Sequence, residues 1–181
     1  MSSLPEPPAP PAATVASSAE LAASLIGTPY RFVEALAQGG MGEVVIANHV
    51  ALGRLVAVKL LHARLAGDPM LVDRARLEAQ ALARLAHPHV VAVTDFGVTA
   101  DRRPYLVMER LFGRTLRQEV TARGPLPVGE AVEIICQALA GLGAAHEIHV
   151  LHRDIKPDNL FLCHAGEGNP RIVKVLDFGV A

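Results

Sequence analysis

The feature that most constrains the fold is a row of short strand-like segments interrupted by a single helical segment. Five segments carry β-branched residues or alternating apolar positions, at residues 30–36, 43–50, 55–61, 90–96 and 104–109. Asp68 and Pro69 favour a helix start, and His87-Pro88 marks its end, so one helix falls between the third and fourth strands. We expect an antiparallel five-stranded sheet carrying one helix.

The rest of the chain has a mostly helical pattern. A short helix is expected near residues 115–121 and a long one over residues 127–146, followed by short apolar strands at 160–162 and 172–176. The long helix is apolar on more than one side, so we expect several neighbours to bury it. The fold class is therefore predicted to be α+β, with a sheet-rich first half and a helical second half.

Composition limits the class of protein. The chain has 181 residues with 51% apolar content, which is enough for a core, and its net charge of −1 is not gathered into a basic patch for nucleic acid. Residues 1–26 are rich in Pro, Ala and Ser and are predicted to be a disordered leader. No signal peptide and no uncharged membrane span is visible, and Cys136 and Cys163 read as reduced core thiols, so we expect a cytoplasmic chain without a membrane partner.

The segment from His152 to Asn159, together with Asp177-Phe178-Gly179, carries the main chemical motif. Asp154 offers a carboxylate to take a proton, Lys156 a cation, and Asn159 and Asp177 oxygen ligands for Mg²⁺. This is the set that phosphoryl transfer from a metal-bound nucleotide needs. The alternative for Asp154, a turn-capping aspartate, does not explain the order of these residues. His146, His149 and His152 lie three residues apart, but no thiol or carboxylate completes a metal site.

A glycine-rich loop, Ala37-Gln38-Gly39-Gly40-Met41-Gly42-Glu43-Val44, precedes the second strand. Alone it could be an ordinary turn. However, a strand rather than a helix follows it, which argues against a dinucleotide-binding unit and favours a flap over phosphates.

Lys59 lies on the next strand, and Glu78 falls in the apolar stripe of the helix. A carboxylate facing a core needs a cation, so we predict an ion pair between Lys59 and Glu78. The alternative for Lys59 is an edge lysine that reaches water.

The connector after the fifth strand lies between the two predicted halves, where ligands often bind. Backbone groups of Glu109 and Leu111 could bind an adenine edge, with Val44, Ala57 and Phe161 closing on its faces. Each of these residues could equally be core.

Together these motifs resemble the eukaryotic-type protein kinase family over about residues 30–181. Lys156-Pro157 is similar to the serine/threonine branch, and the glycine-rich loop to bacterial members. The resemblance implies a kinase N-lobe at residues 27–110, a partial C-lobe at residues 111–181, and ATP and Mg²⁺ as cofactors.

The resemblance also implies residue roles. Asp154 is then the catalytic base, Lys156 steadies the γ-phosphate, and Asn159 and Asp177 hold Mg²⁺. Lys59 contacts the α- and β-phosphates and is positioned by Glu78. Gly39, Gly40 and Gly42 approach the phosphates, and Met108 is the gatekeeper before the connector. A stack that links the lobes is implied at Leu82, Val93, His152 and Phe178.

Two departures from the family pattern limit this reading. Ala37 replaces the first glycine of the loop, which is expected to weaken ATP binding without abolishing it. The sequence ends shortly after Asp-Phe-Gly, before the segments that bind protein substrate, so we expect a truncated domain that exposes apolar helix surface and self-associates.

The leading hypothesis is a serine/threonine protein kinase domain that transfers the γ-phosphoryl of ATP to a protein hydroxyl. The alternatives are an ATP-binding or interaction module without catalysis, and a small-molecule phosphotransferase.

Overall fold

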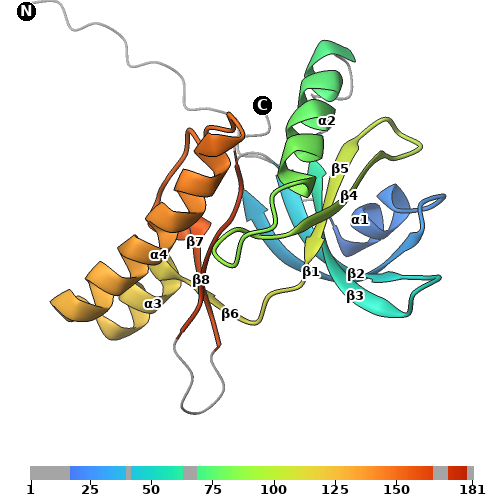
Figure 1. The fold of residues 1–181 in the computed structure, drawn as a ribbon. Coiled ribbons are helices and arrows are strands. Elements are labelled where there is room, and N and C mark those ends of the chain that lie inside the picture. Colours follow the sequence, from blue (N-terminus) through green and yellow to red (C-terminus); the bar gives the residue numbers. More distant parts are fainter. Residues whose placement is uncertain (1–16, 40–41, 63–68, 165–170, 179–181) are drawn as a thin grey trace, which may run out of the picture.

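The structure is a computed structural model that describes residues 17–39, 42–62, 69–164 and 171–178. It contains two antiparallel sheets, with strand orders β1-β2-β3-β5-β4 and β6-β7-β8, and Figure 1 shows them in separate halves of the molecule. The elements in chain order are α1 (Ser18–Ser24), β1 (Tyr30–Gly39), β2 (Gly42–His49), β3 (Arg54–Leu61), α2 (Pro69–Ala83), β4 (Val93–Val98), β5 (Pro104–Glu109), β6 (Gly113–Thr115), α3 (Leu116–Arg123), α4 (Val128–Glu147), the 3-10 turn η2 (Pro157–Asn159), β7 (Leu160–Cys163) and β8 (Val173–Val175).

The five-stranded sheet confirms the predicted N-lobe architecture. Strand β3 lies in its middle, between β2 and β5, and pairs Lys59 with Val44 on one side and with Leu106 on the other. Because side chains alternate along a strand, the sheet has two apolar faces that each need a cover. Helix α2 packs on one face, where it contributes Ala79 and Leu82 to the main core.

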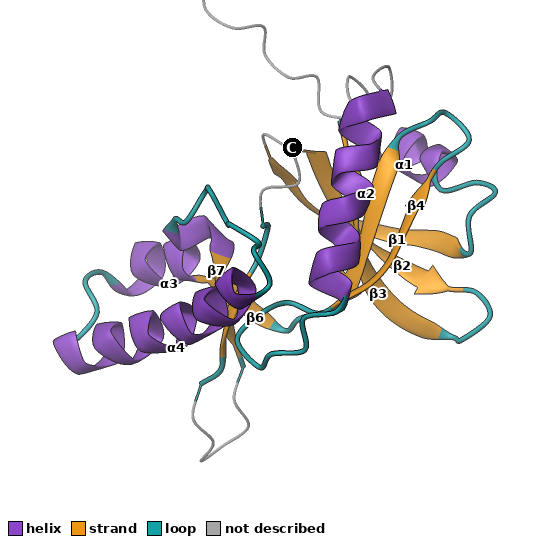
Figure 2. Ribbon diagram, turned by 45° about the horizontal axis from the view of Figure 1, so that its top comes forward, coloured by secondary structure: helices purple, strands orange, loops and turns teal. Residues whose placement is uncertain are grey.

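The other face of this sheet is covered by α1, and this corrects the prediction of a disordered leader for residues 18–26. Leu21 and Leu25 are buried there against a second core that includes Val45 and Tyr105. The two leucines are four residues apart, so they share one side of the helix. Composition concealed this pair because prolines and alanines dominate the segment. Figure 2 shows α1 and α2 with the sheet between them.

The start of α1 is fixed by local hydrogen bonds. The Ser17 hydroxyl accepts a hydrogen bond from the Glu20 amide at 3.3 Å, and the Glu20 carboxylate accepts one from the Ser17 amide at 2.6 Å. This reciprocal capping box satisfies amides that a helix end otherwise leaves unpaired. It also lowers the pKa of Glu20, because the backbone amide of Ser17 favours the carboxylate. The remaining part of the predicted leader, residues 1–16, lies outside the described residues.

In the second half of the chain, α3 and α4 pack beside the small sheet of β6, β7 and β8. The short and long helices were predicted at nearly these positions, but β6 was not, because three residues carry no periodicity to read. The five-stranded sheet ends at Glu109 and the small sheet begins at Gly113, and the lobe boundary at residue 110 remains a prediction.

Helix α4 is packed on one side only. Ile134, Ala138, Gly141 and Ala145 are buried, whereas Val132, Ile135 and Leu139 are exposed. The several neighbours that this apolar helix was expected to need are therefore not present among the described residues, and the exposed apolar helix surface predicted for a truncated domain is confirmed. Among the described residues, α4 is the one helix long and apolar enough to cross a membrane, judged by length and composition alone. The sequence reading missed it because it required a stretch without charges.

The start of β4 also differs from its prediction. The strand was expected from residue 90, but it begins at Val93. Val90 forms an isolated parallel bridge to Val175, and the Val91 amide donates to the Val175 carbonyl at 3.1 Å. These residues therefore join the loop after α2 to β8 of the other half.

Candidate active site

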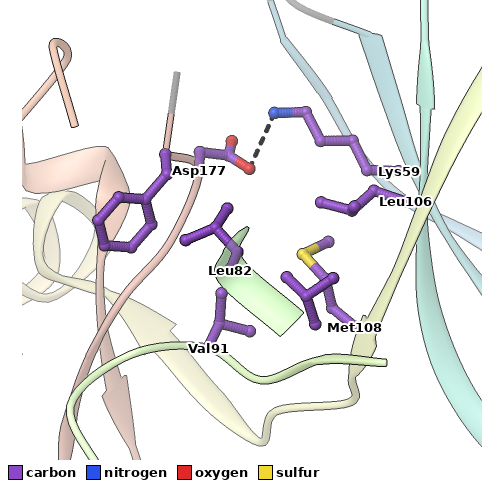
Figure 3. Close-up of a pocket in the computed structure, with 8 residues that line it drawn as sticks. Lys59, Leu82, Val91, Leu106, Met108 and Asp177 are labelled. Carbon is purple, nitrogen blue, oxygen red and sulfur yellow. Dashed lines mark ion pairs between the residues drawn. The ribbon is translucent and has the colours of Figure 1, made fainter. Parts of the chain in front are cut away.

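Lys59 extends from the middle strand of the large sheet toward the other half of the molecule. Its side chain is 3% exposed, and its Nζ lies 2.9 Å from Oδ1 of Asp177 (Figure 3). Leu82, Leu106 and Met108 line the small cavity beside this ion pair. A buried ammonium is costly without a partner, so this contact explains why a lysine is tolerated on an apolar strand.

The predicted ion pair between Lys59 and Glu78 does not form in this structure. Glu78 lies instead beside Arg153, with 3.8 Å between its Oε1 and Nη1 of the arginine. Burial raises the pKa of Glu78, and the positive charge of Arg153 partly opposes that shift. The expectation that a cation meets this carboxylate was right in principle. Its partner was wrong, because a sequence pattern does not locate α2 relative to the residues around Asp154.

Asp154 is held by two neighbours from its own segment. The Lys156 ammonium donates to Oδ2 of Asp154 at 2.6 Å, and Asn159 donates its Nδ2 to Oδ2 at 3.2 Å and to the Asp154 carbonyl at 2.8 Å. The hydrogen bond from Lys156 lowers the pKa of Asp154, and the same contact raises the pKa of Lys156. Asp154 is thus held as a carboxylate with a fixed orientation.

His152 packs against this segment and against Phe178. Its ring centroid lies 4.8 Å from that of Phe178, and its Nδ1 accepts a hydrogen bond from the Asp154 amide at 3.3 Å. Nε2 lies 2.6 Å from the Leu176 carbonyl, which can only accept, so the contacts fit a neutral ring protonated at Nε2. Burial lowers the pKa of His152, which also favours the neutral ring.

The implied stack between the halves is partly visible in the same region. Leu82, Val93 and Phe178 line the same small cavity, and the His152 ring packs against the Phe178 ring. Helix α2, β4 and the segment after β8 therefore meet at one point. Asp177, which precedes Phe178, has a positive φ of 50° that turns its carboxylate toward Lys59.

Charged groups from both halves of the molecule thus gather at their junction. Asp177 pairs with Lys59, and the negative charges of Asp154, Asp158 and Asp177 all contribute to the raised pKa of Lys156. The buried Lys59 Nζ and Glu78 Oε2 make no hydrogen bond with any described residue. The 2.9 Å contact of Lys59 with Asp177 is therefore a charge pair without hydrogen-bond alignment. The Lys59 ammonium can still donate hydrogen bonds, which suits phosphate oxygens. The Asp177 carboxylate beside it suits a metal ion.

Val44, Ala57 and Leu111, predicted to bind adenine, pack in or against the main core together with the predicted gatekeeper Met108. Ala57 and Met108 face each other in adjacent strands, and Val44 and Leu111 pack against the same core. Phe161 lies on β7, pairs with Thr115 and Lys174 in the small sheet, and is partly exposed.

Gly42 begins β2 with a φ of 147°, and an added Cβ there would lie 2.0 Å from the Leu60 carbonyl oxygen. Gly39 has open space around it. Gly40, also predicted to contact phosphate, lies outside the described residues.

Three residues of the site region have roles that the sequence reading missed. Arg153 meets Glu78, and Arg103 pairs with Glu43 next to the glycine-rich loop. Lys174 donates to Oε1 of Glu109 at 2.8 Å, and the same oxygen accepts from the Ala92 amide at 2.7 Å. The sequence has only three lysines, and Lys174 is the one outside the motifs. Because lysine is so rare here, a specific contact of Lys174 could have been suspected from the sequence.

Comparison with known proteins agrees with this geometry. Residues 30–181 match the protein kinase domain, so the chain belongs to the protein kinase family. Its similar relatives are bacterial serine/threonine kinases. It is 45% identical over 152 residues to serine/threonine-protein kinase Pkn1 of Myxococcus xanthus, and 43% identical over 155 residues to serine/threonine-protein kinase PknB of Mycobacterium leprae.

These matches span most of this chain and a smaller part of the relatives. Each covers 84% of this chain, but 21% of Pkn1 and 24% of PknB. Among solved structures, the PknI kinase domain of Mycobacterium tuberculosis is similar, with a TM-score of 0.73 and 32% identity. That match covers 85% of this chain and 61% of the PknI chain. The kinase fold predicted from the sequence is thereby confirmed, and the predicted serine/threonine branch agrees with the names of these relatives.

Proposed function

We propose that this chain binds ATP with Mg²⁺, and that the protein containing it transfers the γ-phosphoryl group to a serine or threonine hydroxyl of a protein. The observation that carries the proposal is the gathering of Lys59, Asp177 and the Asp154–Lys156–Asn159 cluster at one junction. Transferring a phosphoryl group requires cations, a metal-binding carboxylate and a base in one place. The unused hydrogen-bonding capacity of the buried Lys59 Nζ is consistent with a phosphate partner.

The residues of the chain have distinct tasks in this proposal. Asp154, whose pKa is lowered by Lys156, is ionised and can accept the proton of the acceptor hydroxyl. Lys156 balances negative charge next to the transferred group, and Asn159 fixes the orientation of Asp154. Asn159 and Asp177 would hold Mg²⁺, and Lys59 would hold phosphate oxygens. Bound Mg²⁺ and ATP supply the transferable group and the charge that neutralises it.

Two ion pairs must change partners before this arrangement is complete. Asp177 is engaged by Lys59 and must be released to hold a metal ion. Glu78 must leave Arg153 if it is to position Lys59. Because the Glu78–Arg153 contact is 3.8 Å long and partly exposed, its loss requires little free energy. We infer that nucleotide binding favours the rearranged state by its contacts with Lys59 and Asp177.

The catalytic part of the proposal is tested by replacing Asp154 with Asn in the protein that contains this chain. We expect phosphotransfer to fall at least about a hundredfold, the usual contribution of a general base, while ATP affinity changes little. Transfer at the wild-type rate would remove Asp154 from this role. Comparison of peptide and small hydroxylated acceptors tests the acceptor class, because preference for a small molecule would contradict the protein substrate.

The phosphate-binding part is tested by a matched pair of glycine substitutions. Gly42→Ala places a methyl group against the Leu60 carbonyl and should weaken ATP binding at least about tenfold. Gly39→Ala meets no atom within 4 Å and should bind nearly as the wild type does. Equal affinities for the two variants would argue against a phosphate flap at this turn.

A second candidate is a nucleotide-binding module without catalysis. It is favoured by the Lys59–Asp177 and Glu78–Arg153 pairs, since both hold catalytic groups away from their assigned partners. A melting shift caused by ATP and Mg²⁺, without turnover of labelled ATP, would favour this candidate for the chain as given.

We also propose a cytoplasmic location and self-association of this chain. Cys136 and Cys163 are free thiols, and ATP is an intracellular substrate. The exposed apolar residues of α4 provide a surface for a second copy. We expect no membrane contact, since the opposite side of the same helix packs into the core.

A further inference from the structure

A buried ion pair lies directly behind the glycine-rich loop. Glu43, the residue after Gly42, pairs with Nη2 of Arg103 across 60 positions of sequence, and both residues are less than 10% exposed. Arg103 also donates its Nε to the Leu61 carbonyl at 3.1 Å. One guanidinium thus connects the first residues of β2 to the last residue of β3.

Arg103 is itself held firmly by the turn between β4 and β5. Its amide donates to the Thr99 hydroxyl at 2.9 Å, and its carbonyl accepts from the Thr99 amide at 2.9 Å. The Thr99 hydroxyl also contacts Asp101, and Arg102 takes a positive φ of 63° within the turn. The backbone of Arg103 is therefore held in place just before β5, and its side chain extends from this fixed point.

The pair lies on the face of the sheet opposite the proposed nucleotide. Val44 packs into the core that contains Ala57 and Met108, whereas Val45 belongs to the core beneath α1. Side chains alternate along a strand, so Glu43 points to the same face as Val45. Glu43 and Arg103 therefore cannot contact a nucleotide that lies beside Val44. They can influence nucleotide binding only by positioning the backbone of β2.

A buried ion pair is not needed to stabilise this lobe, because an apolar pair of similar volume is often equally stable. In some proteins a buried polar or ionic group fixes the register of the packed elements instead. Here the fixed element is the start of β2, where Gly42 closely approaches the Leu60 carbonyl. A displaced β2 start would move Gly42 relative to Lys59 while leaving Ala57 on β3 and Met108 on β5 in place.

We propose that Glu43 and Arg103 are positioning residues that hold Gly42, at the start of β2, at the correct distance from Lys59 for phosphate binding. This inference rests on the proposed binding of ATP. It predicts an effect on the phosphates alone: the pair should influence affinity for ATP and have little influence on affinity for adenosine, which contacts only the apolar wall. A purely structural role would weaken both ligands to the same extent.

The test measures dissociation constants for ATP with Mg²⁺ and for adenosine by titration calorimetry, in parallel with melting temperature. Glu43→Gln keeps the shape and removes the charge, and we expect ATP affinity to fall about tenfold with less than about a twofold change for adenosine. The double variant Glu43→Met with Arg103→Met removes both charges, so it should remain folded and still lose the preference for ATP. The charge exchange Glu43→Arg with Arg103→Glu should restore part of that preference.

Tyr30→Phe is the matched control. It removes a partly buried hydrogen bond of 2.7 Å to Asp95, which the Tyr30 hydroxyl makes at a distance from Gly42, and should leave the ratio of the two affinities unchanged. If the wild type prefers ATP and the folded double variant keeps that preference, the positioning role is overturned while nucleotide binding stands. If the wild type shows no preference for ATP over adenosine, the proposed function itself fails.

Discussion

The five-stranded sheet and helix α4 are both strongly apolar, but only the sheet is covered on both sides. Helix α2 packs on one face of the sheet and α1 on the other, so its two cores are closed by nearby segments of the same chain. Helix α4 packs through Ile134, Ala138 and Ala145, and exposes Val132, Ile135 and Leu139 to solvent. Both regions have apolar patterns that imply burial, but only the sheet achieves it within the described residues.

This difference shows which part of the fold is locally complete. The strands of the sheet pair mostly with sequence neighbours, and its covers lie directly before β1 and between β3 and β4. Burial of the exposed side of α4 requires a surface from elsewhere. The N-lobe is therefore expected to tolerate isolation better than the α4 region.

The largest effect is expected where α1 covers the sheet. Leu25→Ala removes a side chain that is 2% exposed, and should lower the free energy of unfolding by about 3 kcal/mol through lost burial and the cavity left behind. The adjacent Ile26 is 71% exposed, so Ile26→Ala should cost less than about 0.5 kcal/mol. Unfolding by denaturant measures the free energy of unfolding of both variants. Equal losses would mean that α1 is not a cover.

A smaller loss of stability is expected from a substitution on the packed side of α4. Ile134→Ala should destabilise the chain by about 2 kcal/mol, toward the low end of the range for a buried isoleucine, because this helix has fewer neighbours that would enclose a cavity. Ile135→Ala, one position further on the open side, should change stability by less than about 0.5 kcal/mol. If the second substitution were as harmful as the first, the open side of α4 would have to be covered in solution.

A moderate effect is expected from pH at the junction of the two halves. Burial holds the pKa of His152 below its ordinary value of 6.5, so the unfolded chain binds the proton more readily than the folded chain. Stability should therefore be present in full above pH 6.5 and decrease as pH falls through the lowered pKa. The lowered pKa of Asp154 acts in a separate window, below its ordinary value of 3.8.

Thermal unfolding between pH 7.5 and pH 5.5 measures this dependence. His152→Gln should flatten it, whereas the exposed His146 at the end of α4 provides a control whose replacement by Gln should leave it intact. A wild-type chain that is more stable at pH 5.5 than at pH 7.5 would contradict a neutral buried ring.

The smallest effect on stability is expected on the exposed side of α4, where the effect on association should be largest. Leu139→Lys removes a large exposed apolar side chain and should shift the chain toward monomer in sedimentation experiments, with a stability change within about 0.5 kcal/mol. Ala140→Lys adds the same charge to an exposed position without removing a large apolar group. If both variants associate as strongly as the wild type, α4 is not the contact surface.

Most of the fold could be predicted because its signals are local. Alternation identified the strands of the large sheet, Pro69 identified the start of α2, and the order of Asp154, Lys156, Asn159 and Asp177 identified the chemistry. The elements that were not predicted, α1 and β6, have weak local signals in the sequence. Leu21 and Leu25 gave α1 an apolar side that the surrounding composition concealed, and β6 is too short to show a period.

The charge partners could not be predicted in the same way. An apolar stripe containing Glu78 showed that a cation was required, and both Lys59 and Arg153 could satisfy that requirement. Similarly, nothing near Glu43 in the sequence pointed to Arg103. Partner choice depends on small displacements between elements, whereas the types of residue present depend on the sequence alone.

The sequence by itself determined most of the element types, the resemblance to the kinase family and the set of reactive groups, because periodicity and motif spacing act over a few residues. Only the tertiary structure decided that α1 closes the sheet, that Lys59 pairs with Asp177, and that α4 keeps one apolar side open. The physical reason is that burial and ion pairing are properties of surfaces brought together by the whole chain. A residue pattern specifies which surfaces need partners, and the packed chain specifies which partners they find.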